Sequence, residues 1–203
     1  MRENYPPAAF HSAMNAVGTH DTVRILTLLG VGSDCAAQSK EWRAEYRMTP
    51  EERQRGLQRL RLASLVQYAF PGSPTLYYGD EAGMEGFEDP FNRRPFPWGA
   101  EDRDLTAWYA ALGRARRTLP PLRRGDIQYI RAEGGVLAFT RTWEGDTVLC
   151  AANGGEEPAR LELPGSWADL DGMVTHPARR DTGLARIDLP PMTGLLLRRL
   201  PTP

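Results

Sequence analysis

The chain has 203 residues, of which 41% are hydrophobic, and its 25 basic and 26 acidic side chains leave a formal net charge of -1. This near balance argues against a dedicated nucleic-acid-binding protein, and no apolar stretch reaches the roughly 18 residues of a membrane-spanning helix. Cys35 and Cys150 lie far apart in the sequence, so they predict neither a disulfide framework nor a metal site with paired-ligand spacing.

The amino terminus is typical of a chain that starts inside a larger fold. Residues 2–7 resemble the last turn of a helix that a double proline ends, and no upstream residues supply the rest of that helix. The first ten residues lack the basic and then apolar order of a signal peptide. We therefore expect a truncated beginning and, because no export signal is seen, a cytoplasmic protein.

Residues 12–18 predict a first buried strand because they are mostly small or apolar. The polar segment 19–22 follows this strand, and the apolar residues after it predict a brief helix that Gly30 and Gly32 end. Residues 32–48 are polar and predict a loop.

A long helix is predicted from residue 50 to about residue 70. Thr49 can cap its first turn, Pro50 suits the first helical position, and Glu52 completes a capping box. The order of elements up to this point is therefore strand, short helix, loop and long helix.

The stretch from Pro71 to Trp98 holds a second strand and a long loop. Residues 75–78 form a β-branched and aromatic run with the length of an interior strand, and Gly79 then allows a sharp turn. About twenty residues without periodicity follow, and a loop of that length is usually functional or disordered. Disordered segments are poor in aromatic residues, so we favour a functional loop. Its rings are equally suited to packing the loop down and to stacking on a ligand; they are Phe87, Phe91, Phe96 and Trp98.

The hydrophobic pattern changes in the second half of the chain. A helix is predicted over residues 105–119, with Asp104 as its cap and a double proline as its end. Gly125 marks a boundary. Short strands separated by glycine-rich turns follow it, at 127–132, 136–143, 147–153, 160–163, 185–189 and 195–200. That spacing predicts a small antiparallel β-sandwich.

The element order predicts an α/β part followed by an all-β part. Two strands, each followed by polar residues and a helix, have the pattern of two β/α units of a TIM-type (β/α)8 barrel. We therefore expect residues 1–124 to form the carboxyl-terminal part of an incomplete barrel. Residues 125–203 are expected to form a carboxyl-terminal antiparallel β-sandwich domain.

Carboxylates follow both strands, at the end of the strands where barrel enzymes carry their active sites. Asp21 follows the first strand, whereas Asp80, Glu81 and Asp89 follow the second. Cleavage of a glycosidic bond commonly uses two carboxyl groups that flank the bond. Asp80 and Glu81 are adjacent, however, and neighbours in an extended segment point to opposite faces. We expect one of them to face the site and the other to face the barrel wall.

Two local pairs have both a functional and a plain structural interpretation. His20 and Asp21 can both hydrogen-bond neighbouring sugar hydroxyls, but they can also form a local cap or ion pair, because Asp21 could cap the helix that follows it. Asp89 and Arg93 are four residues apart and can form a simple loop ion pair, worth about 0 to 1 kcal/mol when exposed. The residues alone leave these alternatives open.

Two motifs resemble those of a known family. Asn15–Arg24 (NAVGTHDTVR) resembles the fourth conserved segment of the α-amylase superfamily, glycoside hydrolase family 13. Pro71–Trp98 is similar to the following strand and loop of its neopullulanase, cyclomaltodextrinase and maltogenic amylase branch. The resemblance extends over practically the whole chain, as the last two barrel units and the carboxyl-terminal sandwich. Thr19 and Val23 depart from the usual residues of the first motif, but neither change removes a functional group.

The resemblance implies a retaining enzyme that acts on α-glucan or maltooligosaccharide. Asp21 matches the third catalytic carboxylate, which holds the 2- and 3-hydroxyls of the sugar at the cleavage point, and His20 matches a histidine that binds the same sugar. Asp89 and Arg93 match residues that hold the next sugar towards the non-reducing end.

The family's nucleophilic aspartate and acid glutamate have no counterpart in this sequence. In the family they lie on the fourth and fifth barrel strands, and a closed barrel takes about 250 residues. We therefore expect the chain alone to be inactive. Many relatives bind calcium, but Asp34, Glu88 and Asp89 do not form a loop with recognisable ligand spacing, so no cofactor is expected.

Three functions are consistent with these expectations. The first is the carboxyl-terminal portion of an α-glucan hydrolase or transglycosylase. The second is one half of a split glycosidase, which docks to an N-terminal barrel polypeptide. The third is a non-catalytic sugar-binding or interaction module on the sandwich. Trp143 and Trp167 are its strong candidates, although each is better explained as core or turn packing. No nucleic-acid or membrane partner is expected.

Overall fold

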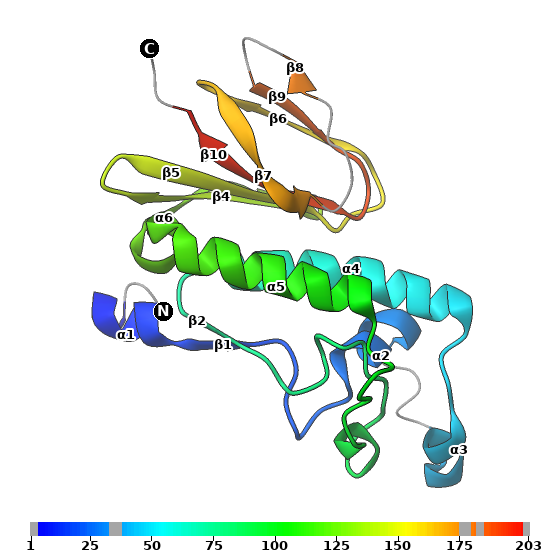
Figure 1. Cartoon of the computed structure of the whole chain (residues 1–203). Helices are drawn as coiled ribbons and strands as arrows, with labels where there is room; N and C mark the ends of the chain where they lie inside the picture. Colours follow the sequence, from blue (N-terminus) through cyan, green and yellow to red (C-terminus); the bar gives the residue numbers. More distant parts are fainter. Residues whose placement is uncertain (1–3, 33–37, 175–179, 182–184, 201–203) are drawn as a thin grey trace.

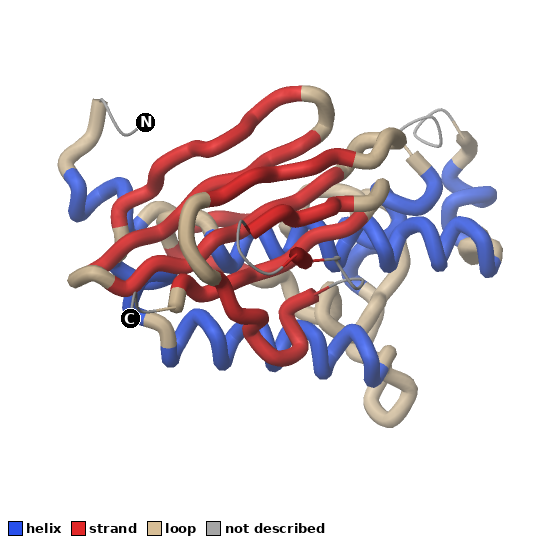
Figure 2. The backbone as a smooth tube through the Cα atoms, turned by 90° about the horizontal axis from the view of Figure 1, so that it is seen from above, coloured by secondary structure: helices blue, strands red, loops and turns tan. Residues whose placement is uncertain are grey.

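The computed structural model describes residues 4–32, 38–174, 180–181 and 185–200. In Figure 1, β-sheets lie at the top and helices α4 (Pro50–Ala69) and α5 (Arg103–Thr118) run beneath them. The strands β1 (Met14–Ala16) and β2 (Ser73–Thr75) lie below these helices together with long loops. Figure 2 looks down on the sheets and shows them lying over the helices. The helices therefore form a layer between the larger sheets and the loops.

The α/β part begins with a short helix and a parallel strand pair. Helix α1 spans Pro7–Ser12, and β1 pairs in parallel with β2 so that Met14 lies opposite Ser73. The predicted last turn of a helix over residues 2–7 lies partly outside the described residues, and within them the double proline does not end a helix. Proline lacks the N–H that the first helical position leaves unbonded, so it begins α1 instead. The second strand begins at Ser73 and ends at Thr75, earlier than the predicted 75–78.

The described residues between the two parallel strands form the helices α2 (Ile25–Val31), α3 (Lys40–Glu45) and α4. The predicted capping box of α4 is confirmed, because the side chains of Thr49 and Glu52 accept hydrogen bonds from each other's backbone N–H groups. The prediction of a continuous loop over 32–48 is wrong. Ser39 caps α3 by accepting a hydrogen bond from the Trp42 N–H, which stabilises a short helix within this polar segment.

Helices α2 and α4 cross at close range through two glycines. A Cβ atom added to Gly56 of α4 would lie 2.8 Å from the backbone oxygen of Leu26 and 3.2 Å from the Cα of Gly30. A Cβ atom on Gly30 would lie 2.5 Å from the backbone oxygen of Glu52. Backbone atoms of a helix cannot move aside as the end of a side chain can. The two glycines therefore set the distance between α2 and α4.

The loop after β2 leads into the short 3-10 helix η2 (Phe91–Arg93), then into α5 and α6 (Pro120–Arg124). Asp102, and not the predicted Asp104, caps α5 by accepting a hydrogen bond from the Leu105 N–H at 3.0 Å. The double proline ends α5 as predicted and also begins α6. Leu105, Trp108 and Leu112 form the buried face of α5 that their spacing predicts.

The residues after 125 form two antiparallel sheets, as predicted. The first has the strand order β3-β4-β5-β10-β7 and the second the order β6-β9-β8. Two strands were not predicted, because β7 contains two aspartates and a glycine, which are uncommon in strands, and β8 is very short. The strands are β3 (Asp126–Glu133), β4 (Val136–Trp143), β5 (Asp146–Asn153), β6 (Ala159–Leu163), β7 (Trp167–Val174), β8 (Arg180–Asp181), β9 (Ala185–Leu189) and β10 (Thr193–Arg199).

The five-stranded sheet packs against other elements on both faces along its central strands β4, β5 and β10, whereas its edge strand β3 is largely exposed. On one face Leu149 packs with Ile187 of the three-stranded sheet, in a core that both sheets share. On the other face Phe139 packs in a second core with Leu65 of α4 and with residues of α5. Every residue of β5 from Thr147 to Asn153 is consequently buried. The second core joins the sandwich to the helices.

Replacing two helix glycines tests the close crossing of α2 and α4. Gly56→Ala is expected to destabilise the protein by about 1 to 3 kcal/mol, because the added methyl group meets the backbone of α2. Gly113 of α5 is the matched control, because a Cβ atom added there meets nothing within 4 Å. Gly113→Ala is expected to stabilise the protein by about 0.5 to 1 kcal/mol. Urea unfolding measures both values, and stabilisation by Gly56→Ala would contradict the crossing.

Candidate functional site

The segment after β1 presents a histidine and a carboxylate to solvent. His20 Nε2 lies 3.1 Å from Asp21 Oδ1, and the two side chains are 59% and 73% exposed. The Asp21 N–H donates to Thr19 Oγ1 and the Thr19 N–H donates to Thr22 Oγ1, so the segment forms a tight polar turn. The N-cap of α2 is Arg24, and no side chain caps this helix. The cap interpretation of Asp21 is therefore wrong, and its carboxylate instead lies in the local pair with His20, exposed to solvent.

The second predicted pair lies on the loop after β2, at η2. Arg93 Nε lies 2.7 Å from Asp89 Oδ1, and both side chains are about half exposed or more. The peptide bond between Asp89 and Pro90 is cis. An exposed ion pair contributes only about 0 to 1 kcal/mol, so its charged groups can turn to a ligand at little cost.

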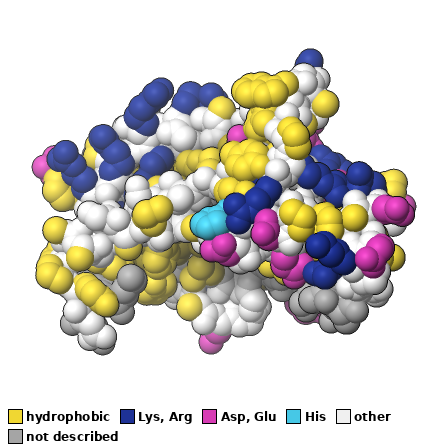
Figure 3. All heavy atoms as spheres, turned by 90° about the horizontal axis from the view of Figure 1, so that it is seen from below, with side chains coloured by type: hydrophobic (Ala, Val, Ile, Leu, Met, Phe, Trp, Pro, Cys, Tyr) yellow, Lys and Arg dark blue, Asp and Glu magenta, His cyan; other side chains and the backbone are white. Residues whose placement is uncertain are grey.

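Asn92 joins the two loops that carry these pairs. Its Nδ2 donates hydrogen bonds to the backbone oxygens of His20 and Thr22, both at 2.8 Å, and its side chain is fully buried. Asn92 itself lies in η2, between Asp89 and Arg93 in the sequence. The two predicted pairs therefore occur on adjacent loops. Figure 3, which views the molecule from below Figure 1, shows a histidine among acidic and basic side chains.

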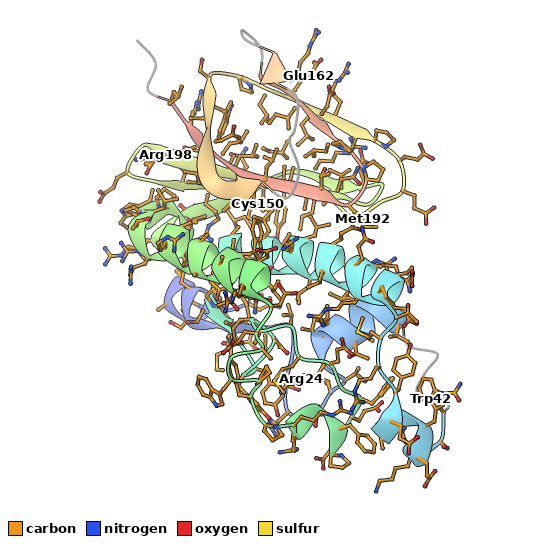
Figure 4. All side chains as sticks on the ribbon, turned by 45° about the vertical axis from the view of Figure 1, so that its right-hand side comes forward. Arg24, Trp42, Cys150, Glu162, Met192 and Arg198 are labelled. Carbon is orange, nitrogen blue, oxygen red and sulfur yellow. The ribbon has the colours of Figure 1, made fainter. Side chains whose placement is uncertain are left out.

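The buried Arg24 fastens the same loops through its guanidinium group. Its Nε donates to the backbone oxygen of Asn92 at 2.9 Å, and its Nη1 donates to Asp80 Oδ1 at 3.1 Å and to the backbone oxygen of Tyr78. The centroids of the Tyr77 and Tyr78 rings lie 4.2 and 4.6 Å from its Cζ. Figure 4 labels Arg24 among the loops on the far side of the helices from the sheets.

Asp80 is a buried partner of Arg24 and does not reach the surface. Its side chain is 1% exposed and packs directly against Gly18, which lies shortly after β1. Burial raises the pKa of Asp80 to about 6, and the nearby Arg24 charge opposes this rise. Glu81 is partly buried, and its Oε2 has no hydrogen-bond partner. Asp80 is thus an interior residue, and the division of Asp80 and Glu81 between the site and the barrel wall stays a prediction.

Sequence reasoning missed Arg24 and Asn92. Arg24 stands between a polar turn and an apolar run, and Asn92 stands between the two residues of a predicted ion pair. A charged residue next to an apolar run is a weak signal of a buried cation, and nothing local identifies its partners. Their hydrogen bonds join residues as much as 72 positions apart in the sequence.

The site offers hydrogen-bonding groups to a ligand rich in hydroxyl groups. Carboxylates accept hydrogen bonds, a guanidinium donates them, and an imidazole can do both. Within the described ranges, no cluster of three or more His, Cys, Asp and Glu residues could hold a metal ion, and no helix is long and apolar enough to cross a membrane. Asp34 and Cys35 lie outside the described residues, and Cys150 is a buried free thiol.

The tryptophans of the sandwich take part in its packing. The Arg124 guanidinium lies 5.9 Å from the centroid of the Trp143 ring. Trp167 packs against the core between the two sheets, and its Nε1 donates a hydrogen bond to the backbone oxygen of Pro164. These contacts favour the packing interpretation of both residues over a sugar-binding role.

Sequence comparisons find relatives of this chain. Residues 127–194 match the family described as Maltogenic Amylase, C-terminal domain. An amylopullulanase from Thermoanaerobacter thermohydrosulfuricus is 41% identical over 139 residues, which cover 68% of this chain and 9% of that protein. Neopullulanase 2 from Thermoactinomyces vulgaris is 31% identical over 204 residues, which cover 95% of this chain and 30% of that protein.

Solved structures share the fold. The type III pullulan hydrolase from Thermococcus kodakarensis matches with a TM-score of 0.72 and 30% identity, over 95% of this chain and 30% of that one. The native debranching enzyme from Nostoc punctiforme matches with a TM-score of 0.72 and 25% identity, over 97% of this chain and 37% of that one. This chain thus spans well under half the length of the proteins it matches.

Removing the Asn92 amide tests the connection between the two loops. Asn92→Asp keeps the shape of the side chain but replaces its donor by an acceptor, which then faces two backbone oxygens. We expect a loss of about 1 to 3 kcal/mol, the cost of leaving buried polar groups unsatisfied. Arg93→Gln is the control at the neighbouring, exposed position and should cost about 0 to 1 kcal/mol. Urea unfolding measures both, and equal small losses would contradict the role of Asn92.

The stability difference between wild type and Asp80→Asn is expected to depend on pH. Because the folded-state pKa of Asp80 is raised from 3.8 to about 6, the native state binds more protons than the unfolded state between these values. Stability therefore falls as pH rises through this window, whereas asparagine does not titrate. Wild type should lose stability relative to Asp80→Asn between about pH 4 and about pH 6, and no further above it. Urea unfolding across this range measures the trend. If wild type instead gained stability relative to Asp80→Asn as pH rises, the attraction of Arg24 for the charged carboxylate would outweigh the effect of burial.

Proposed function

Since the chain is a relative of the glycoside hydrolases of the α-amylase superfamily, in their neopullulanase, cyclomaltodextrinase and maltogenic amylase branch, we propose that it supplies part of the active site of a retaining α-glucan hydrolase or transglycosylase. The relationship confirms the predicted family resemblance of the chain. In this proposal residues 1–124 are the last two units of a (β/α)8 barrel, and residues 125–203 are the carboxyl-terminal domain. The observation that carries the proposal is the exposed His20–Asp21 pair, which Asn92 ties to the loop of Asp89 and Arg93.

Asp21 is the transition-state-stabilising carboxylate of this proposal. Glycoside cleavage passes through an oxocarbenium-like transition state, in which hydrogen bonds to the 2-hydroxyl of the sugar become stronger. An ionised carboxylate makes hydrogen bonds about twice as strong as those between neutral groups. Asp21 is exposed and does not cap α2, so it can accept hydrogen bonds from the 2- and 3-hydroxyls. Because the interaction is stronger in the transition state than in the ground state, it accelerates the reaction.

His20 binds the same sugar, and Asp89 with Arg93 binds the next sugar towards the non-reducing end. The imidazole of His20 lies beside the Asp21 carboxylate, so both side chains can contact neighbouring hydroxyls of one ring. Arg93 provides donors and Asp89 provides acceptors to a second ring. The hydrogen bonds of Asn92 support this assignment of two neighbouring sugars to the two pairs, because they keep the two loops next to each other.

The nucleophile and the general acid come from other barrel units in this proposal. Among the described residues β1 and β2 pair only with each other, so each strand has an outer edge with unpaired backbone groups. Further strands can add at these edges. Those strands belong either to the same enzyme or, in a split glycosidase, to a second polypeptide that docks against this chain.

Hydrolysis of maltotriose and pullulan tests the proposal. The 203-residue chain alone should be inactive, and activity should arise when the polypeptide encoded immediately upstream is added. Asp21→Ala should then lower kcat by about 10³-fold, because hydrogen bonds that strengthen in the transition state supply several kcal/mol. Turnover by the chain alone would show that the nucleophile and the acid lie within it.

Asp188→Ala is the matched control for Asp21→Ala. Asp188 is a carboxylate of β9 that pairs with Arg160 at 2.7 Å, in the sandwich and away from both site loops. Its replacement should leave the hydrolysis rate unchanged. Equal rates for the two alanine variants would contradict the role of Asp21.

A further inference from the structure

Trp98 is the most exposed of the large hydrophobic side chains that the structure describes, at 85% of its surface. Tryptophan is highly buried on average, so this position is unusual. The other rings of the same loop behave differently. Phe87 is buried and packs against Trp42 and Tyr46 of the α3 region. The packing interpretation of the loop aromatics therefore applies to Phe87, whereas the exposed Trp98 ring does not pack the loop down.

A tight turn holds the Trp98 backbone in place. The Ala100 N–H donates a hydrogen bond to the backbone oxygen of Pro97 at 2.9 Å, and Gly99 has a φ of 81°. These features place Trp98 at the second position of a type II-like β-turn, where glycine at the third position is required. The Trp98 N–H also donates to the backbone oxygen of Phe96 at 2.9 Å. Hydrogen bonds thus fix the backbone on both sides of the exposed ring.

The Phe96 ring supports the indole from one side. The centroids of the Phe96 and Trp98 rings lie 4.5 Å apart, with an interplanar angle of 51°. Phe96 is half-buried, so it anchors the exposed ring to the loop. A rigid aromatic side chain that is already held in place loses little conformational freedom when a ligand binds. We call Phe96 and Trp98 the aromatic platform.

The loop of the aromatic platform is connected to the same buried cluster that orders the sugar-binding loops. Tyr78 Oη donates a hydrogen bond to the backbone oxygen of Arg94 at 2.8 Å, and the Tyr78 ring lies against Arg24. Arg94 directly follows Arg93 of the proposed sugar pocket. The aromatic platform and the pocket therefore belong to one continuous, ordered loop.

We propose that the aromatic platform binds a glucosyl unit of the same α-glucan, beyond the two units held by the His20–Asp21 and Asp89–Arg93 pairs. The inference rests on the proposed function for its substrate class. A pyranose ring presents an apolar face of C–H groups, which stacks on an aromatic ring while the hydroxyls stay in water. Charged residues flank the platform in sequence, which suits a ligand rich in hydroxyl groups better than an apolar protein surface; they are Arg93, Arg94, Glu101 and Arg103.

Titration of the ¹⁵N-labelled chain with maltoheptaose tests the platform by NMR. The indole N–H resonance of Trp98, identified by its loss in Trp98→Phe, should shift on binding. Trp98→Ala should raise the Kd about tenfold, as is typical when an aromatic anchor is truncated. Trp98→Phe should retain most of the affinity, because it keeps an aromatic face. Tyr129→Ala is the matched control, because Tyr129 is also an exposed aromatic, at 55%, but lies on β3 of the sandwich.

The His20 imidazole resonance, followed in the same titration, separates this inference from the proposed function. Shifts at His20 with an unchanged Kd for a folded Trp98→Ala variant would overturn the platform and leave the sugar pocket intact. Shifts at Trp98 without any at His20 would support the platform and count against the pocket. Protection of the Trp98 indole N–H from exchange by the upstream polypeptide, without sugar, would overturn the platform because it would reveal a protein contact there.

Discussion

The desolvated charge of Arg24 is the constraint on which the two site loops depend. A buried guanidinium has five N–H donors and is costly unless they are paired. Asp80 supplies the counter-charge, and the backbone oxygens of Tyr78 and Asn92 accept two further hydrogen bonds, whereas the buried Nη2 has no hydrogen-bond partner among the described residues. Breaking such a buried arrangement leaves an uncompensated charge, which is strongly destabilising. The backbone oxygens of Tyr78 and Asn92, which lie in irregular segments, are therefore held next to the Arg24 guanidinium group.

This arrangement explains how a long segment without regular structure can be ordered. Buried backbone groups must find hydrogen-bond partners, and outside helices and sheets side chains have to provide them. Asn92 supplies two such bonds to the first loop, and its own backbone oxygen accepts the bond from Arg24. One residue thus connects the cation to the His20–Asp21 turn. The exposed side chains of the His20–Asp21 and Asp89–Arg93 pairs are not needed for this ordering, so they can contact a ligand.

Local features were predictable from the sequence, whereas long-range contacts were not. The capping box at Thr49 and the bounds of β4 and β9 follow from neighbouring residues, and the structure agrees with them. The helix α3 was missed because one serine cap outweighs a polar composition. The hydrogen bond from Arg24 to Asn92 spans 68 positions, and no local pattern reveals it. The identities of the proposed catalytic and sugar-binding residues came from motif resemblance, since their local pattern also fitted simple ion pairs.

Helix α4 connects the sandwich to the proposed site through its two faces. On one face a Cβ atom added to Gly194 of β10 would lie 2.6 Å from Leu62 and 2.7 Å from Leu65, so the helix rests closely on the sheet. On the other face the buried Gln67 donates hydrogen bonds to the backbone oxygens of Asn15 and Thr75, at 2.6 and 3.0 Å. These bonds fix β1 and β2, the strands that precede the two site loops. The sandwich, where the family match lies, therefore contributes to the proposed site by holding α4 in position.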